Sequence, residues 1–106
     1  MGASVAYAVV HDDPPRVFVA DDITVLQRVL ALEVVARTDP MSLKKEARDE
    51  LREALFEERW ADSLSRWINH TDIAVDVYTH LPVYTDRHLP PDLLGAQLQF
   101  SRLFRD

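Results

Sequence analysis

The sequence lacks several residue types on which common kinds of site depend. None of its 106 residues is cysteine, which excludes disulfides, thiolate catalysis and cysteine-ligated zinc. Only two glycines are present, Gly2 and Gly95, which argues against a glycine-rich phosphate loop and against a turn-dense sandwich or barrel. A cysteine-free chain of this size is typical of the cytoplasm, so we expect a cytoplasmic protein.

Excess positive charge and long apolar runs are also missing. The net charge is −6 and the basic residues are interspersed with acids, so we expect no direct contact with nucleic acid. No run approaches the roughly 20 apolar residues of a membrane span, and the N-terminal "MGASVAYAVVHDD" has no basic flank of the kind found in signal peptides. We therefore expect no membrane association. The preference for arginine over lysine, with abundant alanine and valine, is typical of a bacterial coding sequence rich in G and C.

Two apolar runs near the N-terminus predict a β-hairpin. The first covers residues 5–10 and the second covers residues 16–20, and both indicate strands. Between them lies "HDDPP", in which aspartate supplies turn hydrogen bonds and proline fixes φ. A connection of five residues suits a hairpin.

The middle of the chain predicts helices. Asp21 and Asp22 are suitable caps for a helix over residues 23–37. The segment "TDP" ends this helix, because a residue before proline avoids helical angles. Asp39 and Pro40 then form a start signal for a second helix.

The second helical stretch, residues 41–69, carries two apolar stripes that point in different directions. Their centres differ by roughly 150° on a helical wheel, so one straight helix cannot bury both against one core. We expect a break between Glu57 and Asp62, with Asp62 or Ser63 capping the later helix. The stripes consist of Leu43, Ala47, Leu51, Ala54 and Leu55, and of Phe56, Trp60, Leu64, Trp67 and Ile68.

The C-terminal part predicts a strand over residues 72–78, because polar and apolar positions alternate there. The segment "LPPDLL" predicts a short helical turn that ends at Gly95, and the tail after it is compatible with a strand or a helix. These elements predict one α+β domain over residues 1–106. Its parts are an N-terminal β-hairpin, two to three central helices packed on one face of a small, mostly antiparallel sheet, and one or more C-terminal strands.

A near-repeat follows, in which "VYTHLP" (77–82) precedes "VYTDRHLP" (83–90). The structural interpretation is two extended pieces joined by a turn. Tyr78 and Tyr84 would then pair across the ladder, and Pro82 would lie in the connection or on an edge.

The alternative interpretation of this region is a metal or acid–base site. The candidate residues are His70, Asp72, His80, Asp86 and His88. Zinc accepts imidazole and carboxylate ligands, and a spacing of two residues places both on one face of an extended chain. No dense motif such as H-E-x-x-H is present, so we expect neither a metal nor another cofactor.

Glu33 is a second candidate for chemistry. On a helical wheel it falls within the apolar arc of Leu26, Val29 and Leu30. A carboxylate in that position needs a partner or becomes protonated. One interpretation is a buried general base, and the other is an ion pair with Arg16 or Arg37 where the core tapers.

Aromatic residues mark a candidate interaction surface. Trp60 and Trp67 are seven residues apart and share a helical face, as core residues or as anchors for a partner. Helices on one side of the sheet leave the other side of strand 5–10 uncovered, where we expect Phe18 and Tyr78. A symmetric homodimer is the commonest way to cover such a patch. The tentative interaction residues are Phe18, Trp60, Trp67, Tyr78 and Tyr84.

These features favour a small cytoplasmic protein-interaction or regulatory module without catalytic activity, which associates with itself or with another protein. One alternative is a small metal-dependent or acid–base enzyme that uses the histidine and aspartate cluster or Glu33. Another alternative is an acidic inhibitor that mimics nucleic acid, which only the charge and the size of the chain support.

Overall fold

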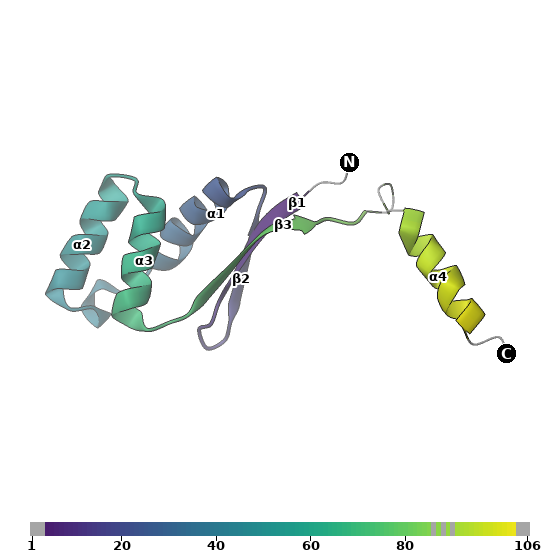
Figure 1. Cartoon of the computed structure of the whole chain (residues 1–106). Coiled ribbons are helices and arrows are strands. Elements are labelled where there is room, and N and C mark those ends of the chain that lie inside the picture. Colours follow the sequence, from purple (N-terminus) through teal and green to yellow (C-terminus); the bar gives the residue numbers. More distant parts are fainter. Residues whose placement is uncertain (1–3, 86, 88, 90, 104–106) are drawn as a thin grey trace.

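The structure is a computed structural model, which describes residues 4–85, 87, 89 and 91–103. At its centre lies a three-stranded antiparallel sheet. The strands are β1 (Ser4–Val10), β2 (Arg16–Ala20) and β3 (Val75–Pro82), in the order β2-β1-β3 (Figure 1). The first two strands form the predicted hairpin. Strand β3 returns from the helices to the other side of β1, so the fold is α+β.

One face of the sheet carries the core. Ala6, Ala8 and Val10 alternate along β1 and are buried. Phe18 lies opposite Ala8 and Val75 lies opposite Val10, so both share this face. Small alanine side chains on the central strand let a helix approach closely, and the larger side chains on the edge strands close the sides.

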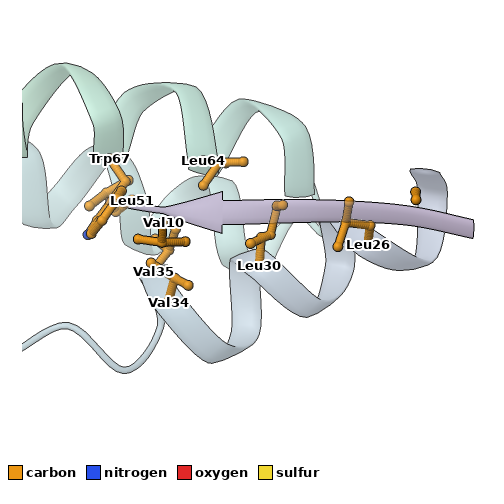
Figure 2. Close-up of a cluster of buried hydrophobic side chains, with 10 residues drawn as sticks. Val10, Leu26, Leu30, Val34, Val35, Leu51, Leu64 and Trp67 are labelled. Carbon is orange, nitrogen blue, oxygen red and sulfur yellow. The ribbon is translucent and has the colours of Figure 1, made fainter. Parts of the chain in front are cut away.

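Helix α1 (Ile23–Leu30) begins where Asp22 accepts a hydrogen bond from the backbone N–H of Val25 at 2.9 Å, as its position predicts. It continues without interruption into the π-helical turn η1 (Ala31–Val35), whose wider geometry buries Val34 and Val35 side by side. The α1 and η1 side chains meet those of β1 in the core cluster of Figure 2.

The predicted break in the long helical stretch is confirmed. Helix α2 (Lys45–Phe56) ends before Glu58, which has the left-handed φ of 58°, and helix α3 (Trp60–Thr71) begins two residues later. The two helices turn their buried stripes to the same core. These stripes are Ala47, Leu51 and Ala54 on α2, and Ser63, Leu64 and Trp67 on α3. The placement of Phe56 in the second stripe was wrong, because Phe56 belongs to α2 and is 89% exposed.

Two predicted helix starts were wrong. Asp39 caps only a short 3-10 turn, η2 (Pro40–Ser42), by accepting from the Met41 N–H. Asp62 does not cap α3; its carboxylate pairs with Arg59 and Arg66.

Hydrogen bonds through the buried indole of Trp67 connect helix α3 to the end of η1. The Trp67 Nε1 donates to the Thr38 hydroxyl at 2.8 Å, and that hydroxyl donates to the Val34 carbonyl at 2.8 Å. Trp67 is 2% exposed. The chain of hydrogen bonds satisfies the one polar atom that this large side chain brings into the core.

An ion-pair network also joins α2 to α3. Glu50 on α2 lies 3.0 Å from His70 Nε2 and 3.4 Å from an Arg66 guanidinium nitrogen, both on α3. The hydrogen bond from His70 and the charge of Arg66 hold the pKa of Glu50 below its ordinary value, against an opposing effect of desolvation.

The C-terminal helix α4 (Pro91–Leu103) stands apart from the rest of the fold (Figure 1). The prediction that Gly95 ends a short turn was wrong, because the helix continues through it. The radius of gyration is 19.7 Å, whereas a compact chain of this length would have about 13 Å. Within the described part of the chain, no helix is long and apolar enough to cross a membrane.

Candidate interaction surface

The face of the sheet opposite the helices is apolar and uncovered. We call it the open face, and it consists of Tyr7, Val9, Val17, Val19 and Tyr78. The two valines of β2 are 60% and 62% exposed, and Tyr78 is 45% exposed. Strand alternation creates this surface on β1 and β2, because Tyr7, Val9, Val17 and Val19 alternate with residues that face the core.

The sheet register sets these side chains in rows across the strands. Val19, Tyr7 and Tyr78 form one row, with Tyr7 in the middle. The rings of Tyr7 and Tyr78 stack with centroids 4.8 Å apart and an interplanar angle of 20°. This pair stiffens the face, since stacked aromatic rings contribute about 0.5–1.5 kcal/mol beyond their burial.

The predicted pairing of Tyr78 with Tyr84 was wrong. Strand β3 ends at Pro82, and Tyr84 follows it without a place in the sheet. An irregularity in β3 also shifts the register, since Tyr7 faces Tyr78 while Val5 faces Leu81. His80 lies within this bulge with a φ of 58°. Pro82 is the last residue of the edge strand β3, a kind of strand in which proline is tolerated.

A polar pair borders the open face. Val9 lies between Val17 and Asp76 in the neighbouring row. The Asp76 carboxylate lies 2.6 Å from His11 Nε2, and the backbone N–H of His11 donates to the Ala74 carbonyl. The one carboxylate in these two rows therefore has a partner.

Helix α4 presents a second uncovered apolar surface. All of its described side chains are exposed, including Leu93 at 46% and Leu98 at 57%. Leu93, Ala96 and Phe100 follow the i, i+3, i+7 spacing of a helical stripe. Leu98 and Arg102 lie on the other side of the helical wheel.

The remaining aromatic candidates lie on the helical side of the sheet. The placement of Phe18 on the uncovered face was wrong, because it packs against the core cluster beside α1. Trp67 belongs to the core itself. Trp60 is half-buried at the start of α3, with the Arg28 guanidinium 6.0 Å from its ring centroid. None of the three contributes to the open face.

The buried-carboxylate interpretation of Glu33 was also wrong. Its side chain is 46% exposed and pairs with Arg37 at 3.2 Å, which is the alternative that the sequence left open. The physical reason is η1, because a π-helical turn holds more residues than an α-helical one and rotates Glu33 away from the arc on which a regular wheel places it.

The candidate metal ligands do not meet in the part of the chain that the structure describes. His70 bonds to Glu50, Asp72 ends α3 with a left-handed φ of 58°, and His80 lies in β3. No group of three or more potential ligands occurs among the described residues. Asp86 and His88 lie outside the described residues, so this prediction is not tested for them.

Sequence reasoning missed the centre of the open face. Val17 and Val19 alternate with Phe18, and this pattern alone shows that β2 has two apolar sides. Leu93 and Leu98 were not singled out because the tail was compatible with two structures.

No family model matches the chain, and no curated protein or solved structure shows significant similarity to it.

Proposed function

We propose that this chain is a protein-interaction module without catalytic activity that works as a symmetric homodimer, in which α4 of each copy packs on the open face of the other. The observation that carries the proposal is the presence of two exposed apolar surfaces in one chain, the open face and the side of α4 that carries Leu93 and Ala96.

Helix α4 needs a packing partner. An isolated helix shorter than about 12–15 residues is marginal in water, and α4 has 13 residues. Gly95 in its interior costs a further ~1 kcal/mol relative to alanine. Since its described side chains are exposed, contact with another surface supplies what local propensity lacks.

The open face fits this helix in size and chemistry. A helix of this length is about 20 Å long, and the seven residues of β1 span about 23 Å. Apolar side chains dominate both surfaces, and Asp76 at the border is already paired with His11. No unpaired charge of the two rows would lose its water on contact.

The direction of the chain favours a second copy as the partner. Strand β3 runs out of the sheet, and α4 follows beyond its end (Figure 1). Pro82 and Pro91 fix φ at both ends of the eight-residue connection. For α4 to pack on its own sheet, the chain would have to reverse its direction within this connection. Packing on the sheet of a neighbouring copy requires no such reversal. A reciprocal exchange is closed by a two-fold axis.

Light scattering of the full chain at micromolar concentration tests the proposal. A mass near twice the 12.2 kDa of one chain is expected. A mass near that of one chain, unchanged as the concentration rises, would refute the dimer.

A mixing experiment tests the exchange itself. A face variant (Val17→Thr with Val19→Thr) keeps an intact α4, and a helix variant (Leu93→Asp with Ala96→Asp) keeps an intact open face. Each variant alone dimerises weakly, because both of its contacts are impaired. Their mixture restores one intact contact, so we expect a heterodimer that is more stable than either homodimer. If α4 instead folds onto its own sheet, mixing leaves the masses of both variants unchanged.

A further inference from the structure

A cavity of about 820 Å³ lies between α2 and the segment from η1 to Leu43, away from the sheet. Seven of its twelve lining residues have apolar or proline side chains, including Val35, Leu51 and Leu55. Its volume and apolar walls are typical of sites for small ligands, which measure about 300–1,000 Å³.

Two arginines line this cavity without an acidic partner. Arg48 and Arg52 are four residues apart on α2 and therefore lie on one side of it. Among the described residues, neither has a carboxylate oxygen within ion-pair distance. Arg37 and Arg66 do have one, in Glu33 and Asp62, while Arg28 lies over the Trp60 ring. A chain with a net charge of −6 thus leaves these two cations unneutralised.

Arg48 adds an independent observation. Its Nε is buried, with no hydrogen-bond partner in the described part of the chain. Its Nη1 reaches only the Met41 sulfur at 3.8 Å, which is a weak acceptor. A buried guanidinium N–H without an oxygen acceptor is costly. Because Nε is closed to solvent, a bound anion would accept from the Nη nitrogens of Arg48.

We propose that this cavity binds a small amphiphile with one carboxylate head and an apolar tail. The carboxylate accepts hydrogen bonds from Arg48 and Arg52, since a planar guanidinium matches the geometry of a carboxylate. The tail lies on Val35, Leu51 and Leu55. Asp49 also lines the cavity and disfavours ligands with several negative charges.

Calorimetric titration of the full chain with decanoate tests this site. Decan-1-ol, which has the same tail without the charge, is the matched ligand. We expect saturable binding of decanoate, and roughly tenfold weaker binding of decanol, because hydrogen bonds to a charged group are the stronger ones. Equal affinity for both ligands, or no saturable binding of decanoate, would overturn the proposal.

Variants locate the head group. Arg52→Gln changes an exposed side chain and is expected to weaken decanoate binding several-fold, with no effect on decanol. Arg48→Gln is expected to weaken it roughly tenfold, with circular dichroism used to verify folding. Lys44→Gln, an exposed cation outside the cavity lining, is the control and leaves the affinity unchanged. Loss of affinity in Lys44→Gln equal to that in Arg52→Gln would show that only net charge matters and would refute the site.

Discussion

The open face provides the most direct test of the proposed dimer. Val17 and Val19 are exposed on β2, and threonine has nearly the shape of valine and an equally high preference for strands. The double variant Val17→Thr with Val19→Thr should therefore leave the monomer fold unchanged. In the dimer, the same two positions would be covered by α4 of the partner, and the new hydroxyls would lose water without gaining acceptors.

The expected magnitude follows from the exposed fraction of the two valines. Each has about three-fifths of its surface left to bury. Replacing one methyl group by a hydroxyl there costs about 1 kcal/mol in lost apolar transfer and hydroxyl desolvation. A symmetric dimer contains four such positions, so the loss is about 4 kcal/mol, which corresponds to a roughly thousandfold increase in the dimer dissociation constant.

Sedimentation equilibrium over a wide range of concentration measures this change, and urea unfolding under monomeric conditions measures the stability of the fold. Val25→Thr is the matched control, because Val25 is 44% exposed on α1, away from the open face. We expect it to leave the dissociation constant within a factor of about two. If the double variant dimerises as the control does, the open face is not the interface.

Three further changes have defined outcomes. Because the pKa of Glu50 is lower in the folded state, the folded chain binds fewer protons than the unfolded chain near the ordinary glutamate pKa. The stabilising effect of Glu50 is present above about pH 4.3 and is lost as the pH falls through the folded-state pKa. Urea unfolding at several pH values should thus show a shallower loss in Glu50→Gln, and an equal loss would contradict this role. Trp67→Phe removes the hydrogen bond to Thr38 and leaves a gap, so we expect it to lower the unfolding free energy by about 2–3 kcal/mol. A decrease of less than about 1 kcal/mol would mean that the indole hydrogen bond does not stabilise the position of α3. Gly95→Ala meets open space and should raise the helix content seen by circular dichroism and tighten the dimer, by up to ~1 kcal/mol per chain; unchanged helix content would show that α4 is already fully formed.

Much of the fold follows from local sequence patterns that tertiary contacts do not override. The hairpin, the cap at Asp22 and the break before α3 depend on turn residues, one side chain and the rotation of an apolar stripe. Two helices joined at Glu58 bring most of both stripes to one core, and the stripe positions predict this break, although the exposed Phe56 does not follow them.

The errors arise where a small backbone irregularity changes which way a side chain points. The π-helical turn η1 turns Glu33 toward water, and a wheel of constant angle cannot anticipate it. The bulge at His80 accompanies a register in which Tyr78 meets Tyr7 and not Tyr84. The position of Phe18 depends on the register of β2 against Ala8, which apolar composition on both sides of β2 does not specify.

The candidate surface was predicted in kind, and of its residues the sequence placed Tyr78 there but not Tyr7, Val9, Val17 or Val19. The sequence indicated an uncovered side of the sheet, and the exposed valines and tyrosine of the open face agree with that expectation. It could not indicate α4 as the complementary surface, since the tail combines a helix-weakening Gly95 with the strand-like alternation of Leu98 and Phe100. The cavity beside α2 could not be predicted from the sequence, because it depends on how η1 and α2 pack in three dimensions.

The two proposed surfaces lie far enough apart to be tested independently. Helix α2 packs on α3, while α1 packs on β1 and β2. Figure 1 accordingly shows α2 at the end of the molecule opposite α4. The variant Val17→Thr with Val19→Thr should therefore leave decanoate affinity unchanged, and Arg52→Gln should leave the dimer mass unchanged. If decanoate instead shifts the monomer–dimer equilibrium, linkage requires that dimerisation shifts decanoate affinity by the same factor, and the two surfaces would belong to one regulated assembly.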